Sequence, residues 1–334
     1  MVVGYIRVYG DNSGKAEKVQ KEMIQRYAEK KGIKEKIPFF IDSSITNKRK
    51  RNRSERKRAN RIKLQEGVSI MPGWETLMEK IIDGEVKNIL VDCKIRLFNG
   101  KEQYQVLQTL CETYGVTIVE VGNDVPSNCI VYYESTHKNR RTSIPLKDID
   151  AIYSECGQLD IVPRLILLEE GKIHHFLDYV DDNTRFVFVK NYQHICRKVY
   201  PTLSMLKTAW SKSVRVISLE ESEIIPVEDI GSEKNVAVVY DKARSKHEAC
   251  SQQLTLDVIQ TFIKIKTKWD VQEVYIDDRN SNSSYSTMKK RLSGDITLVV
   301  DTFGKLGADI SMIVNLLRTG ATIYSLKEGG LCLV

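Results

Sequence analysis

Val2-Val3-Gly4-Tyr5-Ile6-Arg7-Val8-Tyr9-Gly10 opens the chain, and this stretch decides the fold. A short β-branched and apolar run that ends in glycine and the turn-forming residues 11–14 is typical of a buried central strand in an α/β sheet. Arg7 interrupts the run near its carboxyl end, where open α/β sheets bind their ligands. Because a buried arginine is costly to desolvate unless it meets an anion, Arg7 predicts either an internal salt bridge or a phosphate contact.

The next hundred residues alternate between strands and helices. We expect a helix over 15–31 that stops at Gly32, a strand at 37–41, a helix over 73–82, a strand at 88–93, a helix over 101–114 and a strand at 116–121. Such alternation requires right-handed crossovers and a parallel sheet. The sequence therefore predicts a three-layer α/β domain over residues 1–121, with a basic insertion at 46–70.

Four ordered motifs in residues 1–121 resemble the catalytic domain of the serine recombinase (resolvase/invertase) family. That family opens with Tyr-x-Arg-Val-Ser-Thr and a helix containing Gln, continues to a strand with an acidic end, then has Arg-Pro-Gly-Leu, and later a Gly-Glu-Ile strand leading into Asp-Arg-Leu-x-Arg. The matching stretches here are Tyr5-Ile6-Arg7-Val8 with Gln20, Phe39-Phe40-Ile41-Asp42-Ser43, Pro72-Gly73-Trp74, and Gly84-Glu85-Val86 through Arg96-Leu97.

The family's reactive positions are mostly replaced. Tyr9 stands where the family has its nucleophilic serine, and Met71 stands where it has the arginine before Pro-Gly. Counted without gaps from the Gly-Glu motif, the family's aspartate falls on Ile95, its first arginine on Arg96 and its second on Asn99.

The resemblance implies metal-free phosphoryl transfer, in which serine attacks a DNA phosphate and clustered guanidinium groups stabilise the transition state. Without the serine and half of the arginines, we expect a catalytically inactive relative that keeps Arg7 and Arg96 as a residual anion site. An alternative is that the Tyr9 phenol replaces the serine as nucleophile.

The positive charge of the chain is concentrated in one segment. Residues 48–63 contain ten basic residues and one Glu, a net charge of +9, which leaves about −2 for the rest of a chain whose total is +7. The basic residues are Lys48, Arg49, Lys50, Arg51, Arg53, Arg56, Lys57, Arg58, Arg61 and Lys63. Ten cations are enough for salt-sensitive binding to nucleic-acid phosphates, and a solvated loop or an import signal is the alternative interpretation.

Residues 122–233 are less informative and are expected to form an α+β module. Strands are predicted at 129–133, 164–168, 185–190 and 214–219, and helices at 145–153 and 201–210. The stretch Tyr192, His194, Arg197, Lys198, Tyr200 interleaves aromatic and basic groups, which predicts either an ordinary polar strand edge or a nucleic-acid contact.

Residues 234–334 repeat the element order of residues 1–121 without the basic insertion, with the resemblance extending over about 236–328. Tyr240 matches Tyr5, Lys242 stands at the arginine position and Arg244 at the serine position. Ser245 follows one residue later and is a candidate shifted nucleophile. Residues 301–305, Asp-Thr-Phe-Gly-Lys, resemble the Asp-Arg-Leu-Gly-Arg motif with both arginines lost, so this copy is also degenerate.

Composition sets the remaining expectations. At 334 residues, with 28% charged and 42% hydrophobic residues, the chain has room for two or three domains and no run of eighteen apolar residues. Seven cysteines without a C-x-x-C pair indicate reduced thiols in the cytoplasm. The adjacent His174 and His175 would point to opposite faces of a strand. We therefore expect no metal site and no cofactor.

The sequence therefore predicts a degenerate serine-recombinase-like regulator or accessory factor of a mobile genetic element. It would bind nucleic acid non-specifically through the phosphates, with a possible protein partner or homo-oligomer and no membrane association. One alternative is an active DNA strand-transfer or cleavage enzyme that uses Tyr9 or Ser245. The other is a protein-binding scaffold or adaptor.

Overall fold

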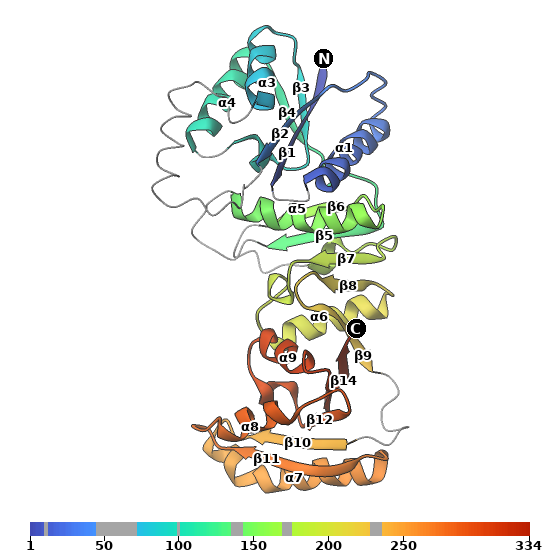
Figure 1. The fold of residues 1–334 in the computed structure, drawn as a ribbon, viewed down its shortest axis with the longest axis vertical. Coiled ribbons are helices and arrows are strands. Elements are labelled where there is room, and N and C mark those ends of the chain that lie inside the picture. Colours follow the sequence, from blue (N-terminus) through green and yellow to red (C-terminus); the bar gives the residue numbers. More distant parts are fainter. Residues whose placement is uncertain (10–12, 45–71, 99–100, 135–142, 169–175, 228–235) are drawn as a thin grey trace. The chain divides into compact units, whose positions relative to one another are not determined.

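The computed structural model describes residues 1–9, 13–44, 72–98, 101–134, 143–168, 176–227 and 236–334, which fall into two compact units. Unit 1 spans Met1–Ile173 and unit 2 spans His174–Val334 (Figure 1). Parallel strands joined through helices dominate both units, so the chain has an α/β fold, as the sequence predicts. The boundary between the units falls inside residues 122–233, which the sequence analysis treats as one central module.

Unit 1 begins with a parallel sheet in the order β2-β1-β3-β4. Its elements are β1 (Val2–Tyr9), α1 (Ser13–Lys30), β2 (Phe39–Ser44), α3 (Pro72–Ile82), β3 (Asn88–Val91), the 3₁₀ helix η1 (Lys94–Leu97), α4 (Lys101–Tyr114) and β4 (Thr117–Glu120). β1 lies inside the sheet and is buried from Val3 to Tyr9, as expected for a central strand. The predicted elements all form, with no end shifted by more than three residues.

Helices cover both faces of this sheet. Val3 and Tyr5 point into a core that they share with Leu77 of α3 and Leu107 of α4. Gly4 faces the opposite side, where α1 packs on β1. Since side chains alternate along a strand, this arrangement gives the three layers that the alternating sequence predicts.

A tyrosine, an aspartate and a helix start are tied together in this sheet. The Tyr5 hydroxyl donates to Asp42 Oδ2 at 2.7 Å, and the backbone N–H groups of Gly73 and Trp74 donate to the same carboxylate at 2.9 Å each. The first N–H groups of a helix lack partners within the helix, so Asp42 caps α3. The carboxylate at the end of β2 therefore positions α3 on the sheet.

Unit 1 continues with β5 (Cys129–Glu134), α5 (Ser143–Gln158) and β6 (Arg164–Leu168). β5 and β6 are parallel neighbours, so this segment has the element order of β1-α1-β2. α5 packs against α1, and a Cβ placed on Gly157 would lie 3.2 Å from Lys15 O and 3.3 Å from Val19 Cγ2. The lack of a side chain at Gly157 allows this close approach.

Unit 2 contains strands in the order β11-β10-β12-β13-β14-β9-β8-β7. In chain order its elements are η2 (Phe176–Tyr179), β7 (Phe186–Val189), η3 (Tyr192–His194), α6 (Val199–Ser211), β8 (Arg215–Ser218), β9 (Ser222–Val227), β10 (Val236–Lys242), α7 (Lys246–Lys266), β11 (Asp270–Asp277), α8 (Ser283–Arg291), β12 (Ile296–Val300), η4 (Phe303–Leu306), α9 (Ile310–Leu317), β13 (Thr322–Ser325) and β14 (Gly329–Leu333). β14 runs antiparallel to both β13 and β9, and β8 runs antiparallel to β9.

The expected repeat is visible in the strand order, because β11-β10-β12-β13 matches β2-β1-β3-β4 and all of these neighbours are parallel. The tyrosine–aspartate cap recurs as well. Tyr240 Oη donates to Asp277 Oδ2 at 3.1 Å, and the N–H groups of Ser284 and Tyr285 at the start of α8 donate to the Asp277 carboxylate at 3.0 and 2.8 Å. Tyrosine and aspartate are 37 residues apart in both copies.

Unit 2 also contains a repeat that the sequence analysis missed. β7-η3-α6-β8-β9 has the element order of β12-η4-α9-β13-β14, and Ser218-Leu219-Glu220-Glu221 matches Ser325-Leu326-Lys327-Glu328. Glu221 accepts the Tyr192 N–H at 2.6 Å, and Glu328 accepts the Phe303 N–H at 3.2 Å.

The two halves of this second repeat meet through matching positions. In the antiparallel pair of β9 and β14, Ile225 lies opposite Cys332, and an isolated bridge joins Lys198 to Asp309. Like positions that pair with each other are the sign of a local twofold relation. Residues 186–227 thus repeat the element order of residues 296–333.

Candidate functional site

The residues singled out in the first copy meet at the carboxyl edge of β1 and β3. Arg7 and Tyr9 lie at the end of β1, and Arg96 lies in η1 directly after β3. Arg96 Nη1 donates to the Arg7 backbone oxygen at 2.5 Å, and Arg7 Nη1 lies 3.5 Å from the Arg96 backbone oxygen. The structure therefore brings together Arg7, Tyr9 and Arg96, which the sequence analysis selected.

The Arg96 guanidinium is completely buried and meets two carboxylates of the same unit. Its Nε lies 2.6 and 2.7 Å from the two oxygens of Asp92, and its Nη2 lies 2.9 Å from Asp150 Oδ1. The Nη2 contact is at ion-pair distance, although its angle is too poor for a hydrogen bond. The Tyr153 ring lies 5.7 Å from the guanidinium carbon, and the Tyr153 hydroxyl donates to Asp92 at 3.2 Å.

Asp150 belongs to α5, which is not part of the β1–β4 segment, and its carboxylate contacts both Tyr9 and Arg96. Its Oδ2 accepts the Tyr9 N–H at 2.7 Å, and its Oδ1 lies 3.3 Å from Gln20 Nε2. Burial raises the pKa of Asp150 to about 6, against the opposing effect of Arg96. Asp150 therefore places a carboxylate between the Tyr9 N–H and the Arg96 guanidinium, where two groups suited to binding an anion converge.

Tyr9 is a poor candidate for a nucleophile in this environment. Its side chain is buried, and the Arg7 guanidinium carbon lies 5.0 Å from the centre of its ring. Burial raises the pKa of the Tyr9 phenol despite the neighbouring Arg7 and Arg96 guanidinium groups, which lower it. A raised pKa reduces the fraction of phenolate, which is the nucleophilic form.

The second copy has a related arrangement around Lys305 of η4. The Lys305 ammonium donates to the Lys242 backbone oxygen at 2.9 Å, as Arg96 does to Arg7. It also lies 2.9 Å from Glu248 Oε2 and 3.2 Å from Asp241 Oδ1. Lys305 therefore occupies the position of Arg96, and its charge too is met by carboxylates of its own unit.

This correspondence revises the placement of one motif. The sequence analysis aligned the family's aspartate with Ile95 in the first copy and with Asp301 in the second. Asp92 and Asp301 each follow the last residue of the equivalent strands β3 and β12, and each precedes the cation of its cluster, Arg96 or Lys305, by four residues. Within this chain Asp301 therefore corresponds to Asp92 and not to Ile95.

Ser245 caps a helix. Its hydroxyl oxygen accepts the Glu248 N–H at 3.1 Å, and Glu248 Oε2 accepts the Arg244 N–H at 3.0 Å. The Ser-x-x-Glu spacing is a capping-box signal, and α7 begins at Lys246, directly after Ser245.

Other selected residues are placed differently. Tyr192 is fully buried and its hydroxyl donates to the Val216 and Ser222 oxygens at 3.1 Å, which fits neither the predicted polar strand edge nor a nucleic-acid contact. Met71, Asn99 and residues 48–63 lie outside the described residues.

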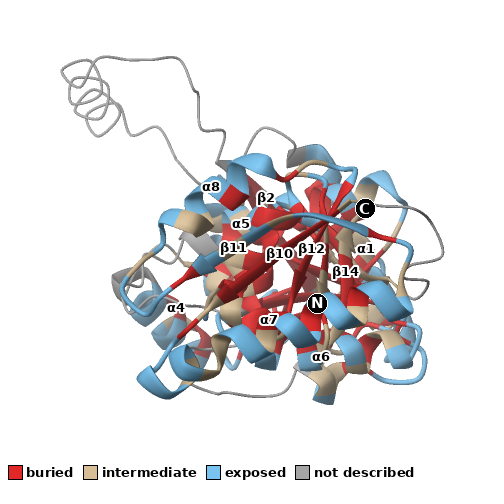
Figure 2. Ribbon diagram, turned by 90° about the horizontal axis from the view of Figure 1, so that it is seen from below, coloured by how far each residue is buried: buried red, intermediate tan, exposed pale blue. Residues whose placement is uncertain are grey.

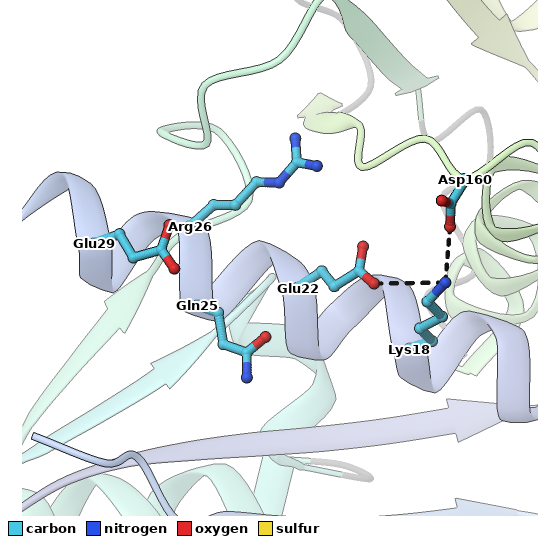
Figure 3. A pocket seen from close by; sticks show the side chains of 6 residues that line it. All are labelled: Lys18, Glu22, Gln25, Arg26, Glu29 and Asp160. Carbon is cyan, nitrogen blue, oxygen red and sulfur yellow. Dashed lines mark hydrogen bonds and ion pairs between the residues drawn. The ribbon is translucent and has the colours of Figure 1, made fainter.

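A hollow of about 370 Å³ lies along the outer side of α1 (Figure 3). Lys18 Nζ crosses one end of it, 2.7 Å from Asp160 and 3.7 Å from Glu22. Its lining consists of Lys18, Glu22, Gln25, Arg26, Glu29 and Asp160. Because these side chains carry both signs of charge and are mostly exposed, the hollow offers no desolvated reactive group.

Comparisons with known proteins add no information about the site. No family model, curated protein or solved structure matches this chain. Within the described ranges, no three His, Cys, Asp or Glu side chains are grouped to hold a metal ion. All seven cysteines are described and free, and Cys93, Cys111, Cys129 and Cys156 are buried. None of the helices that the structure describes is long and apolar enough to cross a membrane.

Proposed function

We propose that this chain is a catalytically silent protein built on the serine-recombinase plan, and that it binds nucleic acid through residues 48–63. The observation that carries the first part is the position of Asp150. Its carboxylate takes the place between the Tyr9 N–H and Arg96 that a phosphate oxygen would need for transition-state stabilisation.

The internal charges of the cluster argue against a reactive role for it. Arg7 and Arg96 supply two positive charges, and Asp92 and Asp150 supply two negative charges when ionised. A buried cluster whose charges balance has no net attraction for a further anion. The residual anion site proposed at Arg7 and Arg96 would therefore be filled by the chain itself.

The nucleic-acid part of the proposal rests on the sequence, because residues 48–63 lie outside the described residues. Their net charge of +9 stands against about −2 for the remainder of the chain. Phosphate contacts are the main source of non-specific affinity for nucleic acid. Six to ten such contacts would give a slope of roughly −5 to −9 for log affinity against log salt on duplex DNA.

A salt titration tests this role. Duplex DNA affinity is measured from about 50 to 200 mM salt for the wild type and for a variant with the ten basic residues of 48–63 changed to Gln. Over this salt range, the affinity of a protein that binds through six to ten phosphate contacts falls by roughly 10³–10⁵. The control variant carries Lys289→Gln, Lys290→Gln and Arg291→Gln on α8. We expect the first variant to lose most of the slope and the control to lose little. Equal slopes in the wild type and the 48–63 variant would refute the proposal.

The competing function is active strand transfer. It predicts a covalent protein–DNA adduct after a denaturing quench of a reaction with supercoiled plasmid, and loss of that adduct in Tyr9→Phe or Ser245→Ala. We expect no adduct, since the Tyr9 pKa is raised and the Ser245 oxygen caps α7.

A further inference from the structure

The outer face of α7 is an exposed apolar strip. Leu254, Val258 and Ile265 are 67%, 52% and 68% exposed, and with Thr261 they follow a spacing of four, three and four residues. That spacing places them on one side of the helix and matches the seam of a two-helix contact. Figure 2 shows exposed residues along α7 beside the buried ones that face the sheet.

The first half of the equivalent strip on α1 is covered. Tyr240 and Asp277 stand 235 residues after Tyr5 and Asp42, so the two copies have no net insertion between these points. At the same offset Leu254 corresponds to Val19 and Val258 to Met23.

Val19 and Met23 are 1% and 0% exposed. Val19 Cγ2 would lie 3.3 Å from a Cβ on Gly157 of α5, so α5 contributes to covering this strip. The first two positions of the strip are therefore apolar in both copies but buried in α1 alone, whereas Thr261 and Ile265 correspond at the same offset to the exposed Arg26 and Lys30 of α1.

The helix that covers α1 is α5, which connects two parallel neighbouring strands just as α1 does. α5 lies between the parallel strands β5 and β6, as α1 lies between β1 and β2 and α7 between β10 and β11. Packing of α1 on α5 is thus a contact between equivalent helices within one chain. Among the residues that the structure describes, α7 has no such counterpart within unit 2.

We propose that the counterpart is α7 of a second copy of this chain, packed antiparallel about a twofold axis between Val258 and Thr261. In that arrangement Leu254 meets Ile265 of the other copy. Asp257 and Lys264, both exposed on one flank of the strip, are seven residues apart, so each Asp257 lies opposite a Lys264. The strip is therefore complementary to itself in shape and charge. This surface is independent of the proposed nucleic-acid role.

Sedimentation equilibrium of the full chain without nucleic acid tests the proposal. We expect a wild-type dimer that Val258→Asp weakens at least about a hundredfold, because a charge would enter the centre of the contact. Val106 of α4 is a matched control, since it is also a helical valine with 52% exposure. Val106→Asp is expected to leave the dimer intact.

Charge reversal provides a second readout that loss of folding would not imitate. Asp257→Lys or Lys264→Asp alone is expected to weaken the dimer several-fold, and the double variant is expected to restore it. A wild-type chain that stays monomeric at about 100 µM would overturn the proposal, since even a weak complex forms at that concentration. A dimer unchanged by Val258→Asp would also overturn it.

Discussion

Replacing Arg96 with methionine removes the group that holds the first sheet's carboxyl edge together. The guanidinium contacts Asp92, Asp150 and the Arg7 backbone oxygen, and both carboxylates are almost fully buried. Removing one partner of a buried ion pair leaves an uncompensated charge and costs about 3–5 kcal/mol. Since domains have free energies of unfolding of about 5–15 kcal/mol, we expect unit 1 to retain only part of its stability.

Because the two units need not unfold together, the loss is measured locally. Hydrogen exchange of peptides covering β1 and η1 reports the opening of this edge, and urea denaturation reports the whole chain. The Arg96→Met protein is expected to regain stability as the pH falls toward 5. Without the guanidinium, which lowers it, the pKa of Asp150 rises further, and protonation of Asp150 then removes one buried charge.

Two further variants test the electrostatic explanation. Adding Asp150→Asn to Arg96→Met removes one of the two uncompensated charges and should recover part of the loss. Lys305→Met, at the equivalent position of the second copy, should also destabilise its sheet, because Lys305 is the cation beside the completely buried Asp241 carboxylate. A loss below about 1 kcal/mol in Arg96→Met would refute the assigned role, because it lies within the range of ordinary surface changes.

Three other outcomes follow from the described contacts. The pKa of Asp150 is raised to about 6, so proton binding to Asp150 stabilises the folded state, and this stabilisation is lost as the pH rises through 6. In urea denaturation, the free energy of unfolding of the wild type relative to Asp150→Asn should therefore increase by about 1 kcal/mol from pH 7 to pH 5. Gly73→Ala should destabilise unit 1 by about 1–3 kcal/mol in thermal unfolding, because its Cβ would lie 2.7 Å from the Ile41 backbone nitrogen, whereas Gly14→Ala, with open space, should not. Tyr240→Phe removes the hydroxyl that donates to the aspartate capping α8 and should cost about 1 kcal/mol, measured by hydrogen exchange at the start of α8.

Local patterns were sufficient for most of the secondary structure. The apolar run that begins at Val2 gave a buried strand, and Gly32, in a left-handed conformation with φ of 70°, ends the turn after α1 where the sequence placed a stop. The short strands β9 and β14 were missed; each pairs with its hairpin neighbour and also with the other, which is distant in sequence. Such pairing leaves little local signal.

The candidate site was predicted only in part. Arg7, Tyr9 and Arg96 were selected from the sequence and do lie together, but Asp92, Asp150 and Tyr153 were not selected. Asp92 had a usable signal, because an acidic residue directly follows the buried strand β3. The signal for Asp150 was weaker: it is a single acidic residue among the apolar positions of α5.

The sequence by itself determined most of the order of strands and helices, the repeat of that order over residues 1–121 and 236–328, and the location of the positive charge, because periodicity, glycine stops and composition are properties of neighbouring residues. Tertiary structure alone decided what Arg96 meets. Its partner Asp150 belongs to a helix that folds back on the first sheet, and the cost of burying a charge depends on which group the fold places beside it. The same packing distinguishes α1, which α5 covers, from α7, whose equivalent positions remain exposed.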